Sequence, residues 1–109
     1  MEIKLVAAAK DDSQFSQKFL QGMINRMIAG GAKYGDINKN QLADKNNLAS
    51  MQLRIDRYRA TGNTEWLIDA ANFCMMEFMY PKEQGAHYRP TDHSESPGYI
   101  NTDGEVRKI

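Results

Sequence analysis

Three polar side chains in an otherwise apolar segment could together bind a metal ion. Glu65, Asp69 and Asn72 are separated by four and three residues, and in a helix this spacing places them on one narrow stripe. Mg²⁺ in proteins is bound by carboxylate oxygens together with phosphate oxygens and water. The stripe therefore predicts a magnesium-phosphate site with Glu65 and Asp69 as metal ligands. A solvated helix face, or an ion pair between Asp69 and an arginine of the preceding segment, is the structural alternative.

Positive charge lies in the segment just before this stripe. Arg54 and Arg57 flank Asp56 there, and Arg59 follows. Arginine binds phosphate or carboxylate through paired hydrogen bonds. The segment can therefore hold an anionic ligand beside a cation, or it can form an internal ion-pair network with the acidic stripe.

A short turn sequence is the third candidate. In Lys33-Tyr34-Gly35-Asp36 the glycine permits a tight turn, the tyrosine can stack on a base, and charges of both signs stand close together. An ordinary helix exit would use the same residues. We expect Lys33, Tyr34 and Asp36 to contribute to ligand binding only together with the other two groups.

Other chemistry has little support in the sequence. His87 and His93 lie six residues apart near the C-terminus and Cys74 lies in the apolar segment, whereas zinc needs three or four convergent nitrogen or sulfur ligands. No basic residue adjoins Cys74 in the sequence to activate its thiol as a nucleophile. We therefore expect Cys74 to be a small core residue.

The positions of apolar residues predict the helices that carry these candidates. Apolar side chains recur every three or four residues, which indicates helices over residues 13–30, 46–61 and 64–80. The first has a candidate cap in Asp12 or Ser13 and a candidate stop at Gly30-Gly31. The third is apolar around nearly its whole circumference, so we expect it to be the central helix, covered on most sides.

The predicted fold is all-α, with a helical domain over residues 1–80 and a polar C-terminal arm over residues 81–109 that packs on the domain or extends from it. The segment EIKLVAAA at residues 2–9 fits either a strand or a helical turn. Three helices of this length bury little surface for a monomer. We therefore expect a homodimer with a shared helical bundle.

Length and charge limit the classes of protein. The chain has 109 residues, which fits one domain, and a formal net charge of zero. Residues 1–62 carry ten basic and six acidic side chains, whereas residues 63–109 carry four and eight. A polybasic nucleic-acid binder is not expected, and neither is a membrane partner, because no apolar run approaches 18 residues. One cysteine and no secretory signal favour a cytoplasmic protein.

The three candidate segments together support a resemblance. The sequences KYGD at 33–36, RIDRYR at 54–59 and NTEWLIDAANFCMMEF at 63–78 occur in this order. Residues 33–80 thereby resemble the MazG-like all-α nucleoside triphosphate pyrophosphohydrolases and their phage-borne, nucleotide-modification-associated relatives. The resemblance implies helix carboxylates as Mg²⁺ ligands, dimers or larger assemblies, and hydrolysis of a nucleotide to its monophosphate and pyrophosphate. These enzymes carry acidic pairs on two facing helices, but residues 13–33 here contain no acidic residue, so a full multi-metal site is not expected.

Three functions follow as hypotheses for a phage-type protein. In the first, a Mg²⁺-dependent pyrophosphohydrolase uses Glu65 and Asp69 as metal ligands and Asn72 to orient a phosphate or water. Phosphates would be held by Arg54, Arg57 and Lys33, and Tyr34 would stack on the base. In the second, the same pocket sequesters a nucleotide or nucleotide-derived signal without turnover. In the third, the chain is an inhibitor that binds a host protein, with the arm contacting a basic surface.

Overall fold

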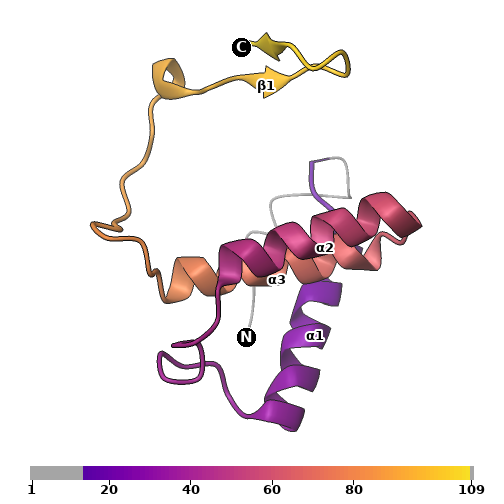
Figure 1. Cartoon of the computed structure of the whole chain (residues 1–109), viewed down its shortest axis with the longest axis vertical. Coiled ribbons are helices and arrows are strands. Elements are labelled where there is room, and N and C mark those ends of the chain that lie inside the picture. Colours follow the sequence, from indigo (N-terminus) through magenta and orange to yellow (C-terminus); the bar gives the residue numbers. More distant parts are fainter. Residues whose placement is uncertain (1–13, 109) are drawn as a thin grey trace.

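The computed structural model describes residues 14–108 and confirms the all-α class. Its helices and strands are α1 (Gln17–Tyr34), α2 (Asn47–Thr61), α3 (Glu65–Met79), the short 3₁₀ helix η2 (His93–Glu95), β1 (Tyr99–Ile100) and β2 (Val106–Arg107) (Figure 1). The segment 2–9 and the candidate caps Asp12 and Ser13 lie outside the described residues. None of the described helices is long and apolar enough to cross a membrane.

Helix α1 begins and ends later than the sequence pattern predicts. Its N-cap is Ser16, whose Oγ accepts a hydrogen bond from the Phe19 backbone N–H at 3.0 Å. The predicted stop at Gly30-Gly31 is wrong, because the helix continues to Tyr34. An interior glycine costs a helix only about 0.5–1 kcal/mol. The chain leaves the helix at Gly35, where φ is +89°. Lys33 and Tyr34 therefore belong to the last helical turn and not to a loop.

Helices α2 and α3 form a tightly packed pair with a short connection. Gly62 ends α2 in the left-handed conformation, with φ of +72°. The side-chain oxygen of Asn63 then accepts from the Glu65 backbone N–H at 3.1 Å at the start of α3. Of the contacts between described elements, those between α2 and α3 are the most extensive. This pair positions the predicted acidic stripe.

Helix α1 crosses this pair at one point (Figure 1). A Cβ added at Gly22 would lie 2.7 Å from Cδ1 of Ile68, so the two helices approach closely here and a larger residue would require the Ile68 side chain to shift. None of the eighteen described residues of α1 is buried. The buried apolar residues among those described are Leu42, Ala70 and Met76. The core is therefore small and lies mainly between α2 and α3.

Helix α3 is less covered than its sequence predicts. Cys74 and Phe78 are both exposed, so the expectation that Cys74 is a core residue is wrong for the single chain. Helix α2 covers one side of α3, and α1 crosses it near Ile68. An apolar composition shows that a helix favours burial, but it does not show how many neighbouring elements are present to cover it.

After α3 the chain leaves the helices and forms a separate structure. Strands β1 and β2 pair antiparallel, with Tyr99 opposite Arg107 and Ile100 opposite Val106. Figure 1 shows this hairpin and η2, in yellow and gold, standing apart from the helices. Of the C-terminal segment predicted as an arm over residues 81–109, we call residues 86–108 the arm from here on. A Cβ at Gly98 would clash with the backbone carbonyl of Arg107, so glycine is required where the hairpin begins.

Candidate functional site

The predicted acidic stripe meets two arginines from two different helices. Arg54 of α2 donates from Nε to Oδ2 of Asp69 at 2.8 Å. Arg26 of α1 approaches the other oxygen, Oδ1, at 3.5 Å through Nη2, and its Nη1 lies 3.5 Å from Oε1 of Glu65. Both carboxylate oxygens of Asp69 therefore face a guanidinium group. This geometry matches the structural alternative that we drew from the sequence, in which Asp69 forms an ion pair with an arginine of the preceding helix.

The two ion pairs of Asp69 differ in burial. The side chain of Asp69 is 16% exposed and that of Arg54 is 26% exposed, whereas that of Arg26 is 49% exposed. The guanidinium carbon of Arg54 also lies 4.4 Å from the centre of the Phe73 ring, a cation-π distance. The Arg54–Asp69 pair thus joins α2 to α3 in a partly dehydrated environment. The longer contacts of Arg26 are more exposed and more strongly screened.

Asn72 lies at the contact between α3 and α1. It is buried, and its Nδ2 donates to the backbone carbonyl of Met23 at 3.2 Å. Its Oδ1 is buried without a hydrogen-bond partner in the described structure. The residue predicted to orient a phosphate or water therefore ties two helices together.

This geometry bears directly on the magnesium prediction. Within residues 14–108, no three His, Cys, Asp or Glu side chains gather where they could hold a metal ion. A cation at Asp69 would have to displace at least one of the two guanidinium groups from its oxygens. The magnesium site stays a prediction. Binding of Mg²⁺ there would require the loss of at least one of these ion pairs.

The remaining predicted ligand residues lie away from the stripe. Arg57 and Asp56 are exposed on α2, where Asp56 accepts from Nε2 of Gln52 at 3.0 Å. Lys33 and Tyr34 stand at the far end of α1, with the Lys33 ammonium 5.2 Å from the centre of the Tyr34 ring. Seven residues of helix separate Lys33 from Arg26, which is about 10 Å along the axis.

Asp36 follows this helix end and is exposed. The structure therefore does not bring the predicted turn residues and the acidic stripe into one pocket.

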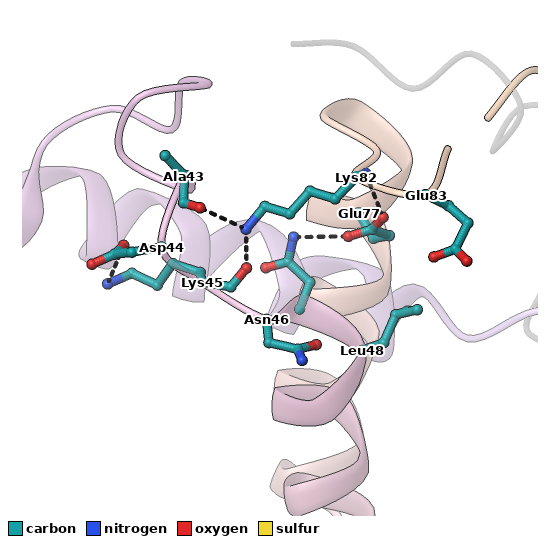
Figure 2. Close-up of a pocket in the computed structure, with 9 residues that line it drawn as sticks. Ala43, Asp44, Lys45, Asn46, Leu48, Glu77, Lys82 and Glu83 are labelled. Atoms are coloured by element: carbon teal, nitrogen blue, oxygen red, sulfur yellow. Dashed lines mark hydrogen bonds and ion pairs between the residues drawn. The ribbon is translucent and has the colours of Figure 1, made fainter. Parts of the chain in front are cut away.

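A cavity at the base of the arm was not anticipated from the sequence. It has a volume of about 390 Å³ and lies between the loop before α2 and the end of α3. Figure 2 shows the Lys82 ammonium reaching across it to the backbone carbonyls of Ala43, at 3.4 Å, and of Lys45. The Lys82 backbone N–H donates to Oε2 of Glu77 at 2.8 Å. Lys82 therefore anchors the chain after α3 to the loop before α2.

The same cavity contains a buried amide. Asn47, the first residue of α2, is almost fully buried and donates from Nδ2 to Oε1 of Glu77 at 3.2 Å. Its Oδ1 has no hydrogen-bond partner among the described residues. Backbone carbonyls, a carboxylate and an amide form an oxygen-rich cluster of the kind that binds cations. The ammonium group of Lys82 already fills the role of the cation at the carbonyls.

A larger groove runs along α1. We call it the α1 groove; its volume is about 680 Å³. Apolar side chains dominate its lining, which consists of Leu20, Met23, Ile24, Met27, Ile28, Gly31, Ala32, Asp36, Ile37 and Met75. Ile28 is 66% exposed. An apolar surface of this kind on a small protein indicates an interaction site.

The arm contains a rigid motif made of its own residues. Arg89 donates a hydrogen bond to each carboxylate oxygen of Glu95, from Nη2 to Oε2 at 2.6 Å and from Nη1 to Oε1 at 3.2 Å. Oδ1 of Asp92 accepts from the backbone N–H and the hydroxyl of Ser94, at 2.5 and 2.7 Å. The Asp92 backbone N–H donates to Glu95 at 3.0 Å and completes a capping box.

Charge and hydrogen bonding in this motif shift three pKa values. The hydrogen bond from Arg89 lowers the pKa of Glu95, with a further contribution from the Asp92 backbone N–H. The hydrogen bonds from Ser94 lower the pKa of Asp92. The pKa of Arg89 is raised by its contact with Glu95. All three groups are therefore held in their charged forms at neutral pH.

Comparison of the chain with protein-family models, with curated proteins and with solved structures finds no match in any of the three. The resemblance of residues 33–80 to MazG-like pyrophosphohydrolases is thus neither supported nor refuted, and it stays a prediction.

Proposed function

We propose that this chain acts by binding a protein partner and that the arm is its recognition element. The proposal rests on one observation: the arm is ordered mainly by contacts among its own residues, with one edge-on contact of the Tyr88 ring on Phe78 of α3 at 6.4 Å between ring centres, and yet it exposes large apolar side chains. Tyr88, Ile100 and Val106 are all more than half exposed. An isolated two-stranded hairpin is marginally stable in water, so a partner that covers this apolar face would gain buried area and stabilise the hairpin.

Shape and apolar contact, more than net charge, support this role. The arm begins beyond the Lys82 anchor and stands apart from the helices (Figure 1). Residues 81–109 carry five acidic and four basic side chains. Several of these charges pair within the arm, including Arg89 with Glu95 and Arg107 with Glu105. The acidic surplus of the second half of the chain therefore lies mainly on α3, and a strongly basic partner surface is not required.

The arginine contacts of Asp69 favour this proposal over hydrolysis. A catalytic metal ligand needs free carboxylate oxygens. Here Arg54 holds one oxygen at 2.8 Å and Arg26 faces the other. The enzyme hypothesis requires a rearrangement of the joint between α2 and α3, whereas binding through the arm requires none.

One observation favours nucleotide sequestration as a second candidate. Arg26 is half exposed, and its contacts to Glu65 and Asp69 are both 3.5 Å long. A phosphate could therefore recruit this guanidinium group at little cost to the helix packing. Tight binding of one nucleotide without turnover, lost in Arg26→Ala, would support this candidate over the arm.

Site-specific photocrosslinking in the producing cell tests the proposed function. A photoreactive residue at Ile100, which is 72% exposed on the hairpin, should give one discrete crosslinked protein. The matched control is the same residue at Gln52, on the exposed side of α2. The purified crosslinked protein should then bind the native chain and bind Val106→Asp at least about tenfold more weakly. Equal crosslinking from both positions, or unchanged binding by Val106→Asp, would contradict the proposal.

A further inference from the structure

The apolar stripe of α1 does not face the helix on which α1 packs. Leu20, Ile24, Met27 and Gly31 share one side of α1, as their spacing requires. Gly22 and Arg26, which meet α3, lie on a different side of the helix, and Met23 between the two sides accepts a hydrogen bond from Asn72 of α3 through its backbone carbonyl. Helix α1 thus contacts α3 through Gly22, Arg26 and the backbone of Met23, and the four stripe residues stay partly exposed.

The apolar stripe of α1 forms one wall of the α1 groove, and Met75 of α3 lines the groove beside it. Ile68, Asn72, Met75 and Met79 lie along one side of α3 at helical spacing. Helix α1 contacts the first two of these residues. Met75 lines the groove and Met79 is exposed. Met75 of α3 and the stripe of α1 therefore line the same apolar groove, and Met79 lies about one turn further along α3.

We propose that a second copy of this chain fills the α1 groove with its own α1. Three buried apolar residues among those described are a small core for a protein of this length. A stable protein interface buries about 800 Å² on each partner, and the apolar groove along the 18-residue α1 is the surface that a partner would cover. In a twofold-symmetric pair the same patch serves both chains, so each α1 fills the groove of the other.

Charge selects the antiparallel arrangement of the two α1 helices. Lys18, Arg26 and Lys33 are the charged residues of α1, and all three are basic. Among the described residues that line the groove, Asp36 alone is charged, and it lies just beyond the C-terminal end of α1. An antiparallel partner brings Lys18 and the positive end of its helix dipole toward Asp36. A parallel partner would place like charges side by side.

The methionines of the groove suit a contact between identical surfaces. Met23, Met27 and Met75 all line it. The unbranched thioether side chain adapts its shape to a partner more readily than leucine or isoleucine does. The groove can therefore close around a second α1 without a preformed cavity for each side chain.

Sedimentation of the full chain in reducing buffer tests the proposal. The wild type should be a dimer at micromolar concentration, and Ile28→Asp should weaken dimerisation at least about a hundredfold, because it places a charge from each chain in the apolar contact. Ile28 is largely exposed in the single chain, so this change should leave helix content and the fold of the monomer intact. The matched control is Ala29→Asp, which is exposed, lies about 100° around the helix from Ile28 and is not among the groove-lining residues.

Spin labels on α1 test the orientation. Labels at Asn25, near the middle of α1, should lie closer to each other across the dimer than labels at Lys18. Equal short separations at both positions would indicate a parallel pair and overturn the antiparallel arrangement. The arm is a separate surface, so Ile100→Asp should leave dimerisation unchanged. This control separates failure of the dimer from failure of the proposed function.

Two other results would overturn the second-copy proposal. A wild type that stays monomeric at all concentrations, with an unfolding temperature lowered by removal of residues 2–13, would assign the groove to this chain's own N-terminal segment. A dimer equally stable in Ile28→Asp and Ala29→Asp would place the contact elsewhere on the molecule.

Discussion

Asp69 forms ion pairs with two arginines that contribute differently to the stability of the fold. The bond from Arg54 is 2.8 Å long and partly buried, and Arg54 also lies against the Phe73 ring. The Arg26 contact is longer and more exposed. Loss of the Asp69 carboxylate would leave Arg54 partly dehydrated without its acceptor, which is the costly outcome for a half-buried charge.

We therefore predict that Asp69→Ala lowers the free energy of unfolding by about 1–3 kcal/mol. Denaturant unfolding followed by circular dichroism measures this change. The control is Asp56→Ala, whose partner Gln52 is on the same helix and exposed; this change should stay within about 0.5 kcal/mol of the wild type. Equal stability of Asp69→Ala and the wild type would contradict the structural role of Asp69.

The arm responds to pH through a few side chains. Asp92 and Glu95 have pKa values below their ordinary 3.8 and 4.5 in the folded arm. A carboxylate with a lowered folded-state pKa stabilises the folded form above its ordinary pKa, and this contribution disappears as the pH falls through the lowered value. Order in the arm should thus be complete at neutral pH and should decline below about pH 4.5.

NMR chemical shifts of the backbone amides at Ser94 and Glu95 measure this transition. They should move toward random-coil values on acidification, while amides inside α2 and α3 keep their folded shifts over the first part of the same titration. In Arg89→Gln the transition should begin at higher pH, because the main cause of the lowered Glu95 pKa is removed. If the amides of Ser94 and Glu95 reach random-coil shifts only at the pH at which α2 and α3 unfold, the arm is not an independently ordered motif.

At the scale of the whole molecule, the sequence pattern predicts the number and order of the helices. Apolar side chains every three or four residues place the three helices within a few residues of their observed positions. The end of α1 is missed because Gly30 and Gly31 weaken a helix without ending it. The hairpin of the arm is missed because each strand has two residues, too few to show alternation.

The site is predicted less well than the fold, for physical reasons. Spacing places Glu65, Asp69 and Asn72 on one stripe, but it cannot show which residues of another helix face them. Arg26 and the Lys82 anchor depend on how separate segments cross, and the sequence carries no signal for that. The capping box of the arm is different, because Asp92 followed by Glu95 three residues later is a recognisable start signal for a helical turn.

Paramagnetic Mn²⁺ titration of the isotope-labelled chain, with a nucleoside triphosphate present, determines whether Asp69 binds a metal ion. We propose that the Asp69 carboxylate is instead a structural partner of Arg54 and Arg26 and that the protein acts by binding a partner. We predict that the amide signals of residues 65–72 broaden no more than that of Asp103, an exposed carboxylate in the arm. Selective broadening of residues 65–72 at low Mn²⁺ concentration, accompanied by release of pyrophosphate, would contradict this proposal and establish a catalytic metal site.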